Sequence, residues 1–191
     1  IHAGVHSTEL FTEDAVDFIE NYDSDSPFFL YLSTLAPHDP RTMPEKYRNM
    51  YDPDKIELPP NFRPMPDFSF GWSDKGRDEA TASFPRRPEE IRRHIADYYA
   101  MISHIDDCVG RVLDALERRG MYDDTIIVFC GDNGLAIGQH GLMGKQNIFE
   151  HSTGVPLIMR GPGIPRGERR GQYVYLLDIY PTLCRLCGLD I

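Results

Sequence analysis

The sequence has no apolar run long enough to cross a bilayer, and it is poor in cysteine, tryptophan and basic residues. A membrane-spanning helix needs about 20 consecutive apolar residues, so we expect no membrane span. The 20 lysines and arginines are outnumbered by 30 aspartates and glutamates, which gives a formal net charge of -10. Binding nucleic acid requires clustered basic side chains that neutralise phosphates, so we expect no nucleic-acid partner. A small anionic ligand is compatible with this charge where a few cations gather locally.

The few cysteines do not indicate a metal or redox site. Cys108 and Cys130 stand alone, while Cys184 and Cys187 form one CxxC at helical spacing, with no second CxxC in the chain. Free cysteine is among the residue types most often buried in proteins. We therefore predict that all four are small core residues.

What the sequence does contain is an alternation of short apolar runs and helical segments. A chain of 191 residues with 41% hydrophobic content is long enough for one domain with a sizeable core. Four runs without polar alternation predict buried strands: residues 28–33 (FFLYLS), 125–129 (TIIVF), 155–160 (VPLIMR) and 173–177 (YVYLL). We predict an α/β fold, a three-layer sandwich with a mostly parallel or mixed central sheet, in which the first three runs are neighbours.

The strongest helix signal covers residues 88–119. Pro88 suits the first helical position, and apolar residues recur behind it at steps of three and four. A first helix is predicted over residues 13–22 with Thr12 as its N-cap, and a last helix follows Asp178.

Residues 41–88 are rich in proline and have few periodic apolar positions. We interpret them as a proline-rich surface excursion within the domain, with one short helix near residues 45–50. Loops of that length without regular structure are usually functional or mobile.

Polar residues follow two of the predicted strands at their carboxyl ends. His38 lies in TLAPHDP, and Asp132 and Asn133 lie in FCGDNG. Ligands of open α/β sheets bind at that edge. Carboxylate and amide oxygens suit a hard cation such as Ca²⁺, which takes six to eight oxygen ligands, so other ligands have to come from elsewhere. The alternative is that DNG is only a tight turn, since Asn-Gly is a favoured turn pair.

Lys145 stands in a glycine-rich loop beyond this turn, between Gly144 and a polar stretch. Glycines at positions 141 and 144 would let the ammonium group approach a bound sulfate or phosphate closely, although a lone lysine in such a loop is usually only solvated. His38 taken alone is more often structural than catalytic. His140 in GQHG has the same two interpretations, a ligand contact or a structural role.

Five blocks of sequence, in this order, resemble one family. They are PFFLYLSTLAPHDP, YYAMISHIDDCVGRVLDALE, TIIVFCGDNG, HGLMGKQNIFEHSTGVPLIMRGPGI and LLDIYPTLCRLCG. Together they resemble the later half of the catalytic domain of the formylglycine-dependent sulfatases, the arylsulfatase-like branch of the alkaline phosphatase superfamily. The resemblance implies an alkaline-phosphatase-like partial domain over residues 1–191 and the hydrolysis of sulfate monoesters.

The resemblance also assigns roles to individual residues. It implies that Asp132 and Asn133 are two ligands of one Ca²⁺ ion, that Lys145 holds a sulfate oxygen, and that His38 contacts the ester near its leaving oxygen. His140 is a further candidate for substrate contact. The implied partner is a small-molecule or carbohydrate sulfate ester, and the implied location is periplasmic, secreted or lysosome-like.

One departure from the family pattern concerns the nucleophile. The family converts a Cys or Ser in a C/S-x-P-x-R motif to formylglycine, and Cys108, which is followed by VGR, lacks the proline. We expect the nucleophile and the remaining calcium ligands to lie in an N-terminal part outside this chain. The isolated chain is then expected to be inactive.

Two other functions remain open at this point. One is a phosphoester or phosphonate hydrolase of the same superfamily, although Asn133 favours calcium over the zinc-like ions of relatives that use histidine there. The other is a truncated module without catalysis. The substrate is expected to be a sulfated carbohydrate, and four arginines are candidates for contact with an anionic sugar: Arg41, Arg63, Arg86 and Arg87.

Overall fold

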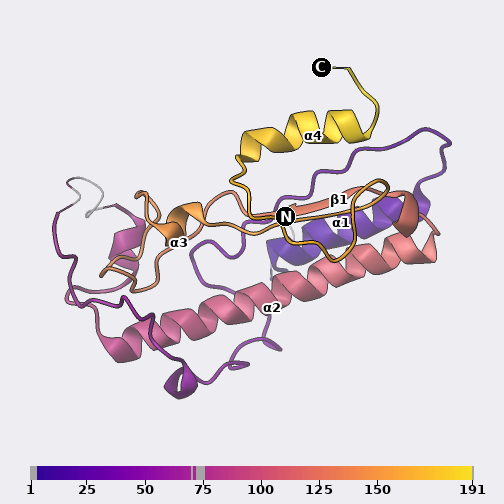
Figure 1. The fold of residues 1–191 in the computed structure, drawn as a ribbon. Coiled ribbons are helices and arrows are strands. Elements are labelled where there is room, and N and C mark those ends of the chain that lie inside the picture. The colour runs from indigo at the N-terminus through magenta and orange to yellow at the C-terminus, as the bar shows by residue number, and fades with distance from the viewer. Residues whose placement is uncertain (1–3, 70, 72–75, 191) are drawn as a thin grey trace.

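The computed structural model describes residues 4–69, 71 and 76–190. Its elements run in the order α1, η1, η3, α2, η4, β1, α3, β2, η5, α4, where η marks short 3₁₀ helices (Figure 1). The bounds are α1 Ser7–Asn21, η1 Pro53–Lys55, η3 Asp78–Thr81, α2 Pro88–Arg118, η4 Tyr122–Asp124, β1 Ile127–Cys130, α3 Glu150–Thr153, β2 Leu157–Arg160, η5 Leu176–Asp178 and α4 Ile179–Leu186.

Helix α2 extends along most of the molecule, and the other segments pack along it (Figure 1). It begins at Pro88 with Glu89 and Glu90 in its first turn, as its sequence predicts. Its amino-terminal part packs against the loop that follows β1, its middle against residues 43–51, and its carboxyl-terminal part against α1 and β1. One apolar helix face therefore supports three buried clusters.

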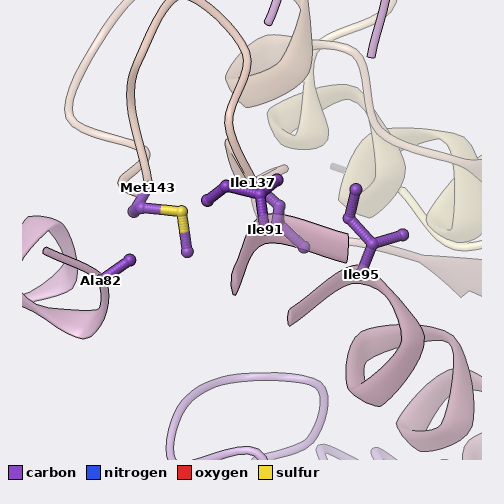
Figure 2. Packing of buried hydrophobic residues seen from close by; sticks show 5 residues of the cluster. All are labelled: Ala82, Ile91, Ile95, Ile137 and Met143. Atoms are coloured by element: carbon purple, nitrogen blue, oxygen red, sulfur yellow. The ribbon is translucent and has the colours of Figure 1, made fainter. Parts of the chain in front are cut away.

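The cluster at the start of α2 connects the helix to the loop beyond β1. Its buried members are Ala82, Ile91, Ile95, Ile137 and Met143. Figure 2 shows Met143 lying between Ala82 and the isoleucines of the helix and loop. Ile91 and Met143 are fully buried, so the loop rests on apolar packing beside its polar contacts.

Helix α1 begins earlier than the sequence indicates. It starts at Ser7, and the imidazole of His6 accepts the Thr8 amide at 3.2 Å as its cap. The prediction that Thr12 caps the helix is wrong, because Thr12 is buried within it and its hydroxyl donates to the Thr8 carbonyl at 2.7 Å.

Strands β1 and β2 pair antiparallel, with Ile127 opposite Arg160 and Cys130 opposite Leu157. The sheet of the described residues is therefore antiparallel, whereas the sequence predicts a mostly parallel or mixed one. A parallel pair needs a crossover that carries the chain back to the other end of the sheet. Here the connection returns at the end where it left, since the Gly131 amide donates to the Pro156 carbonyl at 3.2 Å.

Three other predicted elements are not formed in the described part of the chain. Residues 28–33 and 173–177 have no strand assignment, and Leu176 and Leu177 at the end of the latter belong to η5. Their large side chains are exposed rather than buried on both faces: Phe29 is 80% and Leu177 82% exposed. Residues 45–50 form turns instead of the predicted helix. Their hydrogen bonds, such as Tyr47 N–H to Pro44 C=O, join residues three apart, whereas those of an α-helix join residues four apart.

Two sequence expectations about side chains can also be checked. All four cysteines are free, but only Cys108 and Cys184 are buried, while Cys130 and Cys187 are exposed. The prediction of four core cysteines is therefore wrong for two of them. Cys130 is the last residue of β1, and Cys187 directly follows α4. Among the described helices, none has the length and apolar content needed to span a membrane.

Candidate active site

His38 lies in the loop after residues 28–33, and both of its ring nitrogens have partners. Nδ1 is 3.0 Å from the Asp39 carbonyl oxygen, and Nε2 is 3.1 Å from a terminal nitrogen of Arg77. A carbonyl can only accept and a guanidinium can only donate. His38 is therefore the neutral tautomer with the proton on Nδ1, and Nε2 is an acceptor.

The contacts of His38 continue through Arg77 to the loop that carries Lys145. Arg77 donates to Oδ1 of Asp78 at 3.2 Å, and the Lys145 Nζ lies 4.0 Å from Oδ2 of the same carboxylate. Gln146 also donates to Oδ2, at 3.2 Å. Burial would raise the pKa of Asp78, but the hydrogen bonds from Gln146 and Arg77 and the charge of Lys145 lower it below its usual value. Asp78 thus joins two predicted site residues that are far apart in sequence.

Glu79 holds the backbone of the same loop. Its carboxylate accepts the Met143 amide at 2.9 Å and the Gly144 amide at 2.7 Å, immediately before Lys145. Arg86 donates to the same carboxylate from the other side. Burial raises the pKa of Glu79, and these three donors oppose the rise. The backbone on which Lys145 stands is therefore fixed by residues of the proline-rich excursion.

Arg86 is the most buried of the four candidate arginines, with only 1% of its surface exposed. Its guanidinium donates to the Gly141 carbonyl at 3.0 Å and to the Glu79 carbonyl at 2.9 Å, and it stacks over the Phe84 ring at 3.6 Å from the centroid. The prediction that Arg86 is available to an anionic sugar is wrong, because its donors are used inside the protein. This part of residues 41–88 is buried, although we expected a surface excursion.

Packing against neighbouring segments, rather than access to a ligand, explains why glycine occupies two positions of the Lys145 loop. A Cβ at Gly141, where φ is +77°, would lie 2.5 Å from the Met65 carbonyl carbon and 2.6 Å from the Pro66 nitrogen. A Cβ at Gly144 would lie 2.7 Å from Oε1 of Glu79. Gly141 needs glycine because its φ is positive and the backbone of the excursion lies against it, and a side chain at position 144 would displace the buried Glu79 carboxylate.

Asp132 and Asn133 are exposed at the carboxyl end of β1. The Asn133 side-chain Nδ2 donates to the Gly134 carbonyl at 2.9 Å, so the side-chain oxygen of Asn133 is the atom that a cation would bind. The Asp132 carboxylate accepts the Asn133 backbone amide at 2.9 Å. Further along, the Ala136 amide donates to the Gly144 carbonyl at 3.0 Å, which ties this turn to the Lys145 loop.

These two residues fit a hard cation by donor type. One carboxylate and one amide oxygen, both exposed, are ligands that Ca²⁺ accepts, and they supply only part of the six to eight that it takes. The structure also groups Glu9, His104 and Cys108 between α1 and α2. That group is an ion-pair cluster in which Glu9 binds His104 at 2.9 Å and also Arg111, and it is separate from the predicted calcium ligands.

His140 makes contacts of the structural kind. Its Nε2 is 3.0 Å from the Asn61 amide nitrogen, and its ring stacks on Phe149 with the centroids 4.2 Å apart. His151 lies beside them, with a ring-centroid distance of 6.0 Å to His140. Burial, together with the nearby His140, lowers the pKa of His151 to about 4. A contact between His140 and substrate stays a prediction.

Sequence reasoning missed Arg77, Asp78 and Glu79, which connect and position the predicted residues. The adjacent charges in GRDEA were the available signal, because consecutive acids beside an arginine inside an excursion can mark a buried ion pair. The loop residues that Asp78 and Glu79 contact lie more than sixty positions further along the chain. No local pattern specifies pairing over that distance.

Comparison with known proteins identifies the family of this chain. The family model described as Sulfatase matches residues 3–189, and the chain therefore belongs to the sulfatase family. The choline-sulfatase of Rhizobium meliloti (strain 1021) is 36% identical over 178 residues, which cover 90% of this chain and 34% of that protein. Human iduronate 2-sulfatase is 31% identical over 217 residues, covering 94% and 40%.

Solved structures agree with the fold. The phosphonate monoester hydrolase of Agrobacterium radiobacter superposes with a TM-score of 0.81 at 27% identity, over 96% of this chain and 39% of that one. The α/β fold with its small sheet is thus a partial alkaline-phosphatase-like domain. The chain spans about a third of the length of the first curated relatives that it matches, 34% in both cases.

Proposed function

We propose that this chain is part of a sulfatase that hydrolyses sulfate monoesters by a calcium-assisted formylglycine mechanism. The observation that carries the proposal is the contact path from His38 through Arg77 and Asp78 to Lys145. It connects an imidazole to an ammonium group through the Arg77–Asp78 ion pair, in a chain of the sulfatase family. Both groups have the chemistry that a sulfate ester requires.

Lys145 and His38 act on different oxygens of the ester. Attack on sulfur increases negative charge on the non-bridging oxygens, which the Lys145 ammonium offsets. His38 donates a proton to the departing alcohol oxygen. In the structure, Nε2 of His38 accepts a hydrogen bond from Arg77. Before His38 can protonate the leaving oxygen, this hydrogen bond has to break and Nε2 has to gain a proton.

Asp132 and Asn133 are the residues of this chain that would hold calcium. Their exposed oxygens match its preference, and other ligands have to be supplied by residues outside this chain. When bound, the ion stabilises negative charge on the sulfate oxygens. The His140 ring, at the edge of the same loop, is proposed as a further substrate contact.

The proposed substrate is a carbohydrate sulfate. Iduronate 2-sulfatase is named for a sugar sulfate, and choline-sulfatase for a small alcohol ester, so the family comparison contains both classes. The charged groups around His38 favour the sugar, because they offer several donors and acceptors beside the reacting group. A periplasmic, secreted or lysosome-like location is proposed on family resemblance alone.

The nucleophile is proposed to lie in sequence outside these 191 residues. The letters S-x-P-x-R do occur at residues 83–87 (SFPRR), but the Ser83 hydroxyl donates to the Glu90 carboxylate at 3.0 Å and Arg86 is held in the buried ion pair with Glu79. The test is an aryl sulfatase assay with added calcium, on this chain and on a longer protein that carries both this chain and such a motif. We expect turnover by the longer protein, its loss in Lys145→Ala, and none by the chain alone. Turnover by the chain alone would show that the nucleophile lies within it.

A phosphonate monoester hydrolase is the second candidate, because a protein of that name has a closely similar structure. The same longer protein distinguishes the two when an aryl sulfate and an aryl phosphonate monoester are compared. A higher kcat/KM for the sulfate supports the sulfatase. A preference for the phosphonate by tenfold or more would replace it.

A further inference from the structure

Arg77 contacts one buried carboxylate and the ring nitrogen that the proposed chemistry needs. Its Nη2 donates to Nε2 of His38 at 3.1 Å and to Oδ1 of Asp78 at 3.2 Å, and its Nε donates to the same Oδ1 at 3.3 Å. Only 3% of the Asp78 side chain is exposed, against 78% of the Arg77 side chain. The carboxylate is therefore a fixed point, and the guanidinium attached to it is a solvated group that can change partners.

The contact with His38 occupies the place that a leaving oxygen needs. An atom that takes a proton from an imidazole has to lie about 2.6–3.2 Å from the ring nitrogen, and Nη2 of Arg77 already lies 3.1 Å from Nε2. The other ring nitrogen, Nδ1, donates to the Asp39 carbonyl at 3.0 Å and is not free for this step. A bound ester therefore displaces Arg77 from His38.

Arg77 stays beside the ester after this displacement. Asp78 is held by Gln146, which donates to Oδ2 at 3.2 Å, and by the charge of Lys145 at 4.0 Å. Oδ1 keeps its pairing with the guanidinium, because a buried carboxylate oxygen without donors is costly. The guanidinium consequently turns about Asp78 and keeps its donors next to the leaving alcohol.

The alcohol part of an ester has room at this point. A cavity of about 430 Å³ has a lining that includes Arg77, Asp39 and Thr81, and sites for small ligands typically measure about 300–1,000 Å³. Oxygens on adjacent carbons lie at about hydrogen-bonding distance from each other. An oxygen next to the leaving oxygen is therefore the first acceptor that the displaced guanidinium meets, and a charged donor makes that hydrogen bond a strong one.

We propose that Arg77 is a specificity-determining residue that selects sulfate esters with a hydroxyl group on the carbon next to the ester. It donates to that hydroxyl oxygen once the leaving oxygen has taken its place on Nε2 of His38. The inference rests on the proposed function, which places the sulfate on Lys145 and the leaving oxygen on His38. Esters without the neighbouring hydroxyl displace Arg77 and gain no such hydrogen bond.

Two isomeric aryl sulfates test this on the longer protein that carries this chain together with the nucleophile. Catechol monosulfate has its hydroxyl next to the ester, and hydroquinone monosulfate has the same hydroxyl on the far side of the ring. Arg77→Met has no donor, and we expect it to lower the ratio of kcat/KM for catechol monosulfate to that for hydroquinone monosulfate about tenfold. Effects on folding or on the release of His38 act on both esters alike and cancel in this ratio.

Two further variants locate the effect. Arg77→Lys keeps a charged donor, so its ratio should lie closer to the wild-type value than that of Arg77→Met. Arg48→Gln is the matched control, because the Arg48 side chain is 56% exposed, pairs with the nearby Glu45 and is outside the cavity lining. It should leave the ratio unchanged. A ratio that does not fall in Arg77→Met overturns the inference.

The wild-type protein alone can also overturn it. Equal kcat/KM for the two isomers, or a preference for hydroquinone monosulfate, contradicts the selection by Arg77, while turnover of both esters leaves the proposed function standing. If the folded longer protein hydrolyses neither ester, the proposed function fails and the inference fails with it.

Discussion

Asp78 and Glu79 are neighbours in η3, yet they hold different parts of the candidate site. Asp78 contacts side chains, those of Arg77 and Gln146, and lies near Lys145. Glu79 binds the backbone of the loop that carries the lysine. The first acid fixes charges relative to one another, and the second fixes the loop on which one of them stands.

Removing the charge of Glu79 is expected to loosen that loop. Glu79→Gln leaves the buried guanidinium of Arg86 without its carboxylate, and breaking a buried ion pair in this way costs about 3–5 kcal/mol. Denaturant unfolding measures the loss in stability. Glu89→Gln is the matched control, since the Glu89 side chain is 69% exposed on α2, and it should change stability by less than about 0.5 kcal/mol. Equal effects of the two variants would contradict the role given to Glu79.

His151 offers a pH-dependent test at the same scale. Its pKa of about 4 is below the ordinary 6.5, so the unfolded chain gains the proton first as the pH falls. The folded state therefore loses stability from this residue between about pH 6.5 and 4 and keeps it above that window. An NMR titration of the imidazole should show no protonation down to pH 5. A midpoint near 6.5 would show that the ring is solvated.

Single residues were predictable from sequence where a local pattern carries them. The position of Asn133 at the carboxyl end of β1 follows from the apolar run before it, which does form a strand, whereas the run before His38 forms none. Arg86 was misjudged because arginine is usually exposed, and its buried partner Glu79 is not recognisable as such from the sequence. The roles of His38, Asp132, Asn133 and Lys145 in chemistry stay predictions.

At the scale of elements, the loop after β1 and the proline-rich excursion form one packed unit beside the start of α2. The loop contributes Ile137 and Met143 to the apolar cluster, and the excursion contributes Ala82 (Figure 2). Gly141 lies against the backbone of Met65 and Pro66. Contact at this closeness couples the position of Lys145 to a segment that precedes it by many residues.

Gly141→Ala is expected to separate these two segments. The new Cβ meets backbone atoms at 2.5 Å and 2.6 Å, and φ is +77°, so strain adds to the clash. Gly163→Ala is a matched control with φ +75° and no atom within 4 Å of the added Cβ. It should cost only the backbone strain of about 1–2 kcal/mol. Hydrogen exchange at residues 142–146 should accelerate in Gly141→Ala and not in Gly163→Ala.

Helices and strands were predictable from the sequence where neighbouring residues alone determine them. The periodicity of α2 and its first proline fixed its bounds closely. The run at residues 28–33 has the composition of a buried strand, but a strand also requires a partner for its backbone, and Phe29 and Tyr31 are exposed here. The orientation of β2 depends on how residues 131–156 return, which no residue pattern in β2 records.

On the scale of the whole molecule, three buried clusters support the region of the candidate site, while many large apolar side chains elsewhere are exposed. The three clusters along α2 hold the excursion, the loop and α1. Exposed aromatic and aliphatic side chains are found at residues 28–33 and 173–177, including Tyr173 and Leu177. These are the two runs for which the sequence predicts buried strands that the structure does not form.

We propose that His38 and Lys145 bind one sulfate group. An NMR titration with inorganic sulfate, in calcium-containing buffer, follows the His38 ring and the Lys145 ammonium nitrogen together. Both signals should shift with a single dissociation constant, and Lys145→Gln should abolish the response of His38. Lys55→Gln, at an exposed lysine of η1, should leave it unchanged. A His38 response that persists in Lys145→Gln, or two different dissociation constants, would contradict the account.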